Sequence, residues 1–123
     1  MSVSNPPQHV YLRSIDANKQ DSLSLIAGLI HPGQTILDLG MGSGALGQYL
    51  AQRFSVHADG VTLNPAEADL AKSCYRQVHI ADLDAVTLAD LFSPQCYDAI
   101  ICADVLEHLK APQHLLAQCA ALL

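Results

Sequence analysis

The stretch that decides how this chain folds is ILDLGMGSG, residues 36–44. Its apolar beginning is typical of a buried strand, and its glycines predict a tight turn that opens a helix at about Ala45. Glycines in such a turn let the backbone pass close to a ligand held at the N-terminus of the following helix. The stretch therefore predicts a nucleotide-type cofactor at the end of a strand.

Outward from this stretch, strands and helices alternate along the chain. Short apolar runs predict strands at residues 35–39, 56–61, 77–81 and 97–103, and helix-forming segments occupy residues 45–54, 65–74 and 88–92. A first helix is predicted at about residues 19–30 and a last one at about residues 112–122. This alternation is typical of parallel βαβ units, so we expect an α/β fold with a doubly wound parallel sheet.

The length of 123 residues indicates one domain. Residues 1–18 contain Asn5-Pro6-Pro7 and show no apolar period, so they predict an irregular N-terminal segment, and residues 19–123 form the predicted domain. No apolar run approaches the roughly 20 residues that cross a bilayer, and the chain does not begin like a secretory signal. The four cysteines form no C-x-x-C pair and predict reduced, buried thiols. We expect a cytoplasmic protein without a membrane partner.

The net charge of the chain and the distribution of its basic residues indicate which partners it can bind. Six Lys and Arg residues against twelve Asp and Glu residues give a net charge of −6, and the basic residues are scattered along the chain. Nucleic-acid-binding domains concentrate basic residues on one surface. We therefore expect no nucleic-acid partner.

The glycine turn is compatible with two cofactors. Gly40-x-Gly42-x-x-Ala45 satisfies a loose dinucleotide pattern, so an NAD-binding oxidoreductase domain is one alternative. Asp38 argues against it, because a carboxylate at the strand end would lie near the negatively charged pyrophosphate of NAD. The same carboxylate would suit the cationic ammonium and sulfonium of S-adenosylmethionine. NAD-binding chains also place Asp or Glu about 20 residues further on, where this chain has Thr62. We therefore expect S-adenosylmethionine.

Four motifs, in order, resemble those of class I S-adenosylmethionine-dependent methyltransferases. They are DLGMGSG (38–44), GVTLNP (60–65), ADL (81–83) and YDAIICADVLEHL (97–109). The resemblance covers residues 11–123 and is closest to bacterial domains with a DVLEHL step, which occur alone or fused to glycosyltransferases of surface-polysaccharide pathways. It implies a Rossmann-like sheet ordered 3-2-1-4-5-7-6. Only the first four strands are found here, so we expect the N-terminal, cofactor-binding part of such a domain, truncated after the fourth strand and its following helices.

The resemblance also implies roles for individual residues. The implied cofactor-binding residues are Asp38, Gly40, Met41, Gly42, Gly44, Thr62, Leu63, Asp82, Leu83 and Ala103. Among them, Asp82 would accept from the adenine amino group, Leu83 would pack on the ring, and the Ala103 carbonyl would receive the ammonium. Thr62 stands where most members carry an acidic residue that holds both ribose hydroxyls. We therefore expect modest affinity, and tighter binding after Thr62→Asp.

His108 is the candidate catalytic residue. If its segment is helical, Asp104, Glu107 and His108 share one face, and small-RNA 3′-end methyltransferases use a similar E-x-x-E-H step for magnesium. No other His is placed to complete such a site, so we predict no metal. His108 could act as a general base near the methyl acceptor, or have only a structural hydrogen-bonding role.

The function that follows is methyl transfer by direct displacement onto an unidentified small-molecule or sugar acceptor. A non-catalytic cofactor-binding module or fragment is the alternative from another class. The run at residues 99–103 is apolar at every step, which is typical of a central strand with neighbours on both sides. Because no fifth strand follows it, we expect an open edge there and a homo-oligomer formed through that edge.

Overall fold

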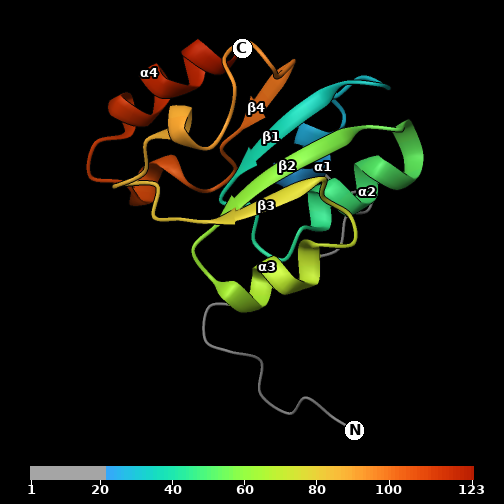
Figure 1. The fold of residues 1–123 in the computed structure, drawn as a ribbon. Coiled ribbons are helices and arrows are strands. Elements are labelled where there is room, and N and C mark those ends of the chain that lie inside the picture. Colours follow the sequence, from blue (N-terminus) through green and yellow to red (C-terminus); the bar gives the residue numbers. More distant parts are fainter. Residues whose placement is uncertain (1–21) are drawn as a thin grey trace, which may run out of the picture.

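The computed structural model describes residues 22–123, which form one parallel sheet with helices on both faces (Figure 1). The strands are β1 (Thr35–Leu39), β2 (His57–Thr62), β3 (Gln77–Ile80) and β4 (Ala99–Ile101). Their order in the sheet is β3-β2-β1-β4, and all three pairings are parallel. The chain thus winds outward from β1 in both directions, which confirms the doubly wound, Rossmann-like fold. The N-terminal segment predicted at residues 1–18 lies outside the described residues.

Helices occupy the connections between strands. The α-helices are α1 (Ser22–Ala27), α2 (Ala45–Phe54), α3 (Pro65–Ala71) and α4 (Pro112–Leu122), and η1 (Leu88–Asp90) and η2 (Leu106–His108) are single 3₁₀ turns. The helix predicted at residues 88–92 is therefore only a 3₁₀ turn. The first helix ends at Ala27, before Gly28, a residue that disfavours helix interiors, and not at Ile30 as predicted. Within residues 22–123 no helix is both long and apolar enough to span a membrane.

The core has two parts, one on each face of the sheet, and β1 contributes to both. Ile36 packs with Leu46 and Leu50 of α2 on one face. Leu37 and Leu39 point to the other face, where they pack in one cluster with side chains of η1 and α4. Successive side chains of a strand point to opposite faces, so an apolar β1 is buried on both. This places Asp38 on the same face as Ile36, next to α2.

The fourth strand differs from its prediction. Only Ala99–Ile101 is a strand, and among the described residues it pairs with β1 alone, so the expected second neighbour is not found there. Tyr97 lies before the strand because its backbone N–H donates to the carbonyl of Leu122 at 3.1 Å, at the end of α4. Asp98 then joins the start of β1, where its carboxylate accepts from the Thr35 N–H at 2.8 Å.

The cysteines are only partly as predicted. All four are free, but only Cys119 is buried, and Cys96 is exposed. Cys96 belongs to the turn that precedes β4, where side chains face solvent. Cys74 and Cys102 are half-buried.

Candidate functional site

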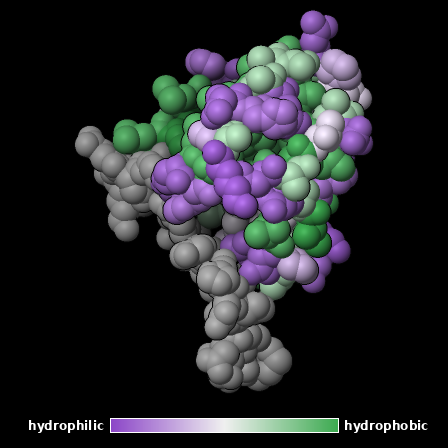
Figure 2. Space-filling view, turned by 90° about the vertical axis from the view of Figure 1, so that its left-hand side faces the viewer, coloured by the Kyte–Doolittle hydropathy of each residue, from purple (hydrophilic) through white to green (hydrophobic). Residues whose placement is uncertain are grey.

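A cavity of about 730 Å³ opens at the carboxyl ends of the four strands. Segments that follow each strand line it: residues 40–43 after β1, residue 63 after β2, residues 81–84 after β3 and residues 103–105 after β4. Hydrophilic side chains gather over the middle of this side of the molecule, with hydrophobic ones between and around them (Figure 2). Ligands of open α/β sheets bind at this end of the strands, where the strand order reverses.

The cavity brings together ten of the eleven site residues predicted from the sequence. They are Asp38, Gly40, Met41, Gly42, Thr62, Leu63, Asp82, Leu83, Ala103 and His108. Gly44 is the one that does not line it. It precedes α2 at φ 89°, and a Cβ there would lie 2.9 Å from both Ala71 Cβ and Tyr75 Cε1. The absence of a side chain at Gly44 therefore serves the packing of α2 against α3, away from the cavity.

The turn after β1 is shaped by its contact with the segment after β4. Gly40 has φ 70°, and a Cβ there would collide with the side chain of Val105, which is buried. The Gly40 and Met41 N–H groups donate to the carbonyl of Val61 at 2.8 and 3.0 Å. Only glycine combines this backbone conformation with this close approach. The turn is thus fixed between β2 and the segment that carries Asp104 and His108.

Asp38 is the most deeply buried carboxylate that lines the cavity, since only 3% of it is exposed. Its Oδ2 accepts a hydrogen bond from the Tyr75 hydroxyl at 2.6 Å. Burial raises the pKa of Asp38 from 3.8 to about 7, although the hydrogen bond from Tyr75 acts in the opposite direction. Asp38 therefore changes charge close to neutral pH in the absence of a ligand.

A second buried carboxylate, Glu67, was missed by the sequence analysis. It is 6% exposed, it lines the cavity, and its Oε1 accepts from Thr62 Oγ1 at 3.2 Å. A Cβ on Gly42 would lie 3.6 Å from Glu67 Oε2, so the carboxylate lies beside the glycine turn. An acidic side chain is thus present five residues after position 62, in contact with Thr62.

The start of α3 explains how Glu67 reaches the cavity and why it was missed. Asn64 caps the helix, and its Oδ1 accepts from the N–H groups of Ala66 and Glu67 at 2.8 and 3.4 Å. Glu67 is therefore the third residue of α3, a position where acidic residues are common because of the helix dipole and reciprocal capping. In sequence it resembles an ordinary first-turn Glu, and only the fold shows that it faces Thr62.

The segment after β3 is connected to the segment before α4. Asp82 Oδ1 accepts from the Asp84 N–H at 2.9 Å, and Asp84 Oδ1 accepts from the Lys110 N–H at 2.9 Å. These bonds hold the Asp82–Leu83 pair at the rim of the cavity. Leu63, which is 70% exposed, lies on the rim after β2.

The segment that carries His108 is not an α-helix, although a shared face of Asp104, Glu107 and His108 would require one. Asp104 precedes η2 in a turn with φ 54°, so Asp104, Glu107 and His108 do not follow one helical face. Asp104 and His108 line the cavity, whereas Glu107 does not. Within residues 22–123 no group of three or more His, Cys, Asp and Glu side chains is placed to hold a metal ion.

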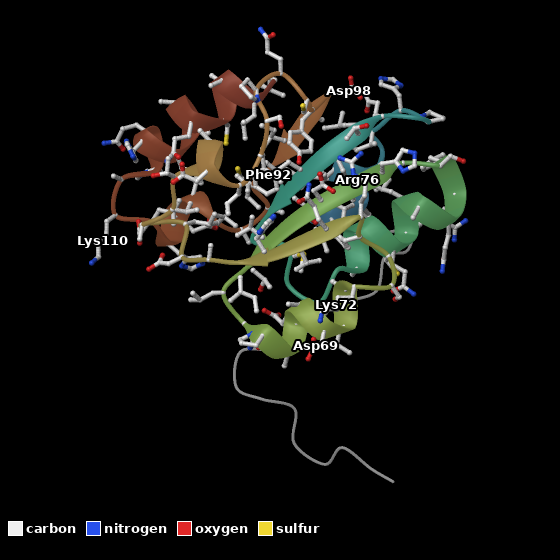
Figure 3. The ribbon with its side chains drawn as sticks, viewed as in Figure 1. Asp69, Lys72, Arg76, Phe92, Asp98 and Lys110 are labelled. Atoms are coloured by element: carbon white, nitrogen blue, oxygen red, sulfur yellow. The ribbon has the colours of Figure 1, made fainter. Side chains whose placement is uncertain are left out.

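The charge of the cavity lining is one-sided. No described residue that lines it is Lys or Arg. Five of the described lining residues are carboxylic acids: Asp38, Glu67, Asp82, Asp84 and Asp104. The described cations lie elsewhere. Arg53 stacks over the Tyr49 ring, Lys72 pairs with Asp69 at 3.2 Å, and Arg76 pairs with Asp59 at 2.7 Å. Figure 3 shows Lys72 beside Asp69 on α3, and Lys110 extending outward at the edge of the molecule. Such a lining favours a ligand with positive charge and disfavours phosphates.

Comparison with known proteins identifies the family of this domain. A family model described as a methyltransferase domain matches residues 37–123. The chain belongs to the methyltransferase-domain family. The match begins in β1 and includes all the residues after β2, β3 and β4 that line the cavity.

Methyltransferases that act on different atoms resemble this domain. It is 31% identical over 85 residues to (S)-tetrahydroprotoberberine N-methyltransferase of Eschscholzia californica, and 31% identical over 97 residues to the ubiquinone biosynthesis O-methyltransferase of Coxiella burnetii. These alignments cover 66% and 74% of this chain but only 24% and 39% of the two relatives. A solved TehB-like SAM-dependent methyltransferase from Corynebacterium glutamicum has a TM-score of 0.64 and 27% identity, covering 82% of this chain and 55% of that one. The methyltransferase domain described here therefore spans well under half of the curated relatives.

Proposed function

We propose that this methyltransferase domain binds S-adenosylmethionine in the cavity and transfers its methyl group to a small-molecule or sugar acceptor. The observation that carries the proposal is the lining of five carboxylates without a described Lys or Arg, beside a glycine turn that brings the backbone close to the ligand. S-Adenosylmethionine carries a sulfonium and an ammonium against one carboxylate. The pyrophosphate of NAD would instead place negative charge among these carboxylates, which disfavours the oxidoreductase alternative.

The residues that line the cavity fit the parts of this cofactor. Asp38, at the end of β1, offers a carboxylate to the cationic methionine portion, and the Ala103 carbonyl offers an acceptor to the ammonium. Glu67 has a buried carboxylate that can accept two hydrogen bonds from the ribose hydroxyls, with Thr62 donating to it from behind. Asp82 and Leu83 provide an acceptor and an apolar surface for the adenine. Glu67 thus takes the place that the sequence analysis gave to Thr62.

The chemistry requires little of the protein beyond placement and proton removal. When bound, the cofactor supplies an electrophilic methyl group on its sulfonium. A new bond from an acceptor oxygen or nitrogen to this carbon forms as the carbon–sulfur bond breaks, and the acceptor loses a proton. His108 is exposed on the cavity lining, and an imidazole nitrogen there can act as the general base that accepts this proton. A cytoplasmic location is part of the proposal and is supported by the four free thiols.

Calorimetry of the purified chain with S-adenosylhomocysteine and with NAD tests the cofactor. We expect S-adenosylhomocysteine to bind and NAD to compete poorly, and tighter binding of NAD would overturn the assignment. Transfer of a labelled methyl group to a panel of sugars, amines and phenols tests the activity. Cofactor binding without transfer to any acceptor would favour the alternative of a non-catalytic module.

A further inference from the structure

Tyr75 occupies a space that three glycines from two elements leave open. Gly44 and Gly47 belong to the start of α2, and Gly60 is in the middle of β2. A Cβ on Gly44 would lie 2.9 Å from Tyr75 Cε1, and one on Gly47 would collide with the ring. A Cβ on Gly60 would collide with Met41 Sδ and would also lie 3.0 Å from Tyr75 Cδ2. The ring is buried, and it enters from the segment between α3 and β3. Three missing side chains around one aromatic ring fix its position closely.

The hydroxyl of Tyr75 is held at the end of this space by two hydrogen bonds. It accepts from the Gly47 N–H at 3.0 Å and donates to Asp38 Oδ2 at 2.6 Å. Gly47 is in the first turn of α2, so the helix start, the tyrosine and the carboxylate form one chain of hydrogen bonds. Asp38 lines the cavity, whereas Tyr75 does not. Of the two described hydrogen-bond partners of the Tyr75 hydroxyl, Asp38 is the one that lines the cavity.

We propose that Tyr75 is a positioning residue of the cofactor site, and that its hydroxyl fixes the orientation and the charge of the Asp38 carboxylate. The inference rests on the proposed function, because it concerns the affinity for S-adenosylmethionine and S-adenosylhomocysteine. A donor at 2.6 Å stabilises the ionised carboxylate more than the protonated one, and the ionised form attracts the ammonium group that both ligands carry. Burial alone would leave Asp38 protonated to a higher pH.

Asp38 titrates in an acidic environment with few opposing charges. Tyr75 contacts it from the segment before β3, and the charge of Asp38 is one of the causes that raise the pKa of the Cys102 thiol, just after β4. The other titratable residues that line the same cavity come from α3, the segment after β3, and the segment after β4 with η2: Glu67, Asp82, Asp84, Asp104 and His108. Burial is the largest cause of the raised pKa of Asp38. The Tyr75 hydrogen bond is the described contact that lowers the pKa of Asp38.

The test is Tyr75→Phe, which keeps the ring and removes only the hydroxyl. Carbon-13 NMR of the ligand-free chain follows the Asp38 carboxyl, identified by its loss in Asp38→Asn. We expect Tyr75→Phe to raise the pH of half-titration by about one unit. Calorimetry should then show S-adenosylhomocysteine binding weakened about fivefold at pH 7, but within about a factor of two of wild type at pH 8.5. A purely structural tyrosine would give a loss that does not depend on pH.

The matched control is Tyr97→Phe. Tyr97 is also buried and also donates to a buried aspartate, Asp59, but neither residue lines the cavity. Removal of the Tyr97 hydroxyl should leave the pH dependence of S-adenosylhomocysteine binding unchanged. Gly47→Ala is a second variant, because its Cβ would displace the Tyr75 ring, and it should shift the Asp38 titration in the same direction.

The outcomes separate this inference from the proposed function. An Asp38 titration that is the same in Tyr75→Phe and wild type, or an affinity loss that is equal at both pH values, would overturn the role of Tyr75. If the wild-type chain binds no S-adenosylhomocysteine at any pH, the proposed function fails, and the role of Tyr75 in cofactor binding fails with it. Absence of binding in the wild-type chain is a different result from equal binding by the wild type and Tyr75→Phe, so the two failures can be told apart.

Discussion

Replacing Asp38 with Asn should stabilise the ligand-free protein above neutral pH while weakening its binding of S-adenosylhomocysteine. Asp38 is 3% exposed, and its pKa is raised from 3.8 to about 7 by burial. The folded state therefore holds a proton between these pH values that the unfolded state has lost. The free energy of unfolding falls as pH rises from about 4 to about 7, and the loss is complete above pH 7. At roughly 1.4 kcal/mol per pH unit, the full cost is on the order of 4 kcal/mol.

Urea denaturation of the ligand-free chain at pH 5 and pH 8.5 measures this cost. Asn at position 38 cannot ionise, and its side-chain oxygen can still accept from Tyr75, so the variant should gain stability over wild type by a few kcal/mol more at pH 8.5 than at pH 5. Calorimetry should show the opposite effect on S-adenosylhomocysteine, with affinity reduced roughly tenfold because a charged acceptor is lost. The same difference in stability between variant and wild type at both pH values would refute the reasoning.

Four further predictions concern other parts of the molecule. Glu67→Gln should weaken the binding of S-adenosylhomocysteine roughly tenfold in calorimetry, since a charged acceptor is removed. Thr62→Asp should not tighten binding, because it would place a second carboxylate against Glu67. Tighter binding by Thr62→Asp would restore the original expectation for position 62. Gly40→Ala should lower the free energy of unfolding by about 2 kcal/mol or more beyond Gly33→Ala, since both glycines have positive φ but only the Cβ at Gly40 meets another side chain; equal losses in urea denaturation would contradict this. The open edge of β4 remains a proposed self-association surface, and sedimentation velocity over a range of concentrations should show a dimer, whereas a monomer throughout would exclude it.

Much of the fold follows from local pattern in the sequence. The apolar run before the glycine turn predicts both ends of β1 correctly, because a strand buried on both faces cannot carry polar side chains at many positions. The order β3-β2-β1-β4 agrees with the family resemblance. The limits of β4 were harder to predict. The predicted strand begins at Tyr97, but the backbone N–H of Tyr97 donates to the end of α4, a long-range contact that pattern alone does not show.

The candidate site also contains residues that local pattern predicts and residues that only the fold shows. Residues that directly follow strands, such as Gly40 and Asp82, were predicted because their place in a motif also fixes their place in the sheet. Glu67 and Tyr75 were missed because their contacts depend on the fold: Glu67 accepts from Thr62 on another element, and Tyr75 donates to Asp38, which is distant in sequence. Gly44 shares a motif with Gly42 but faces α3, because the backbone turns between them.

The most direct test of the cofactor assignment is chemical-shift mapping of the nitrogen-15-labelled chain during titration with S-adenosylmethionine. The assignment predicts shifts at the amides of Gly40, Gly42, Leu83 and Ala103, which line the cavity, and none at Arg76, which lies away from it. NAD should leave the same amides unchanged at equal concentration. Shifts produced by NAD at these glycines and not by S-adenosylmethionine would contradict the account.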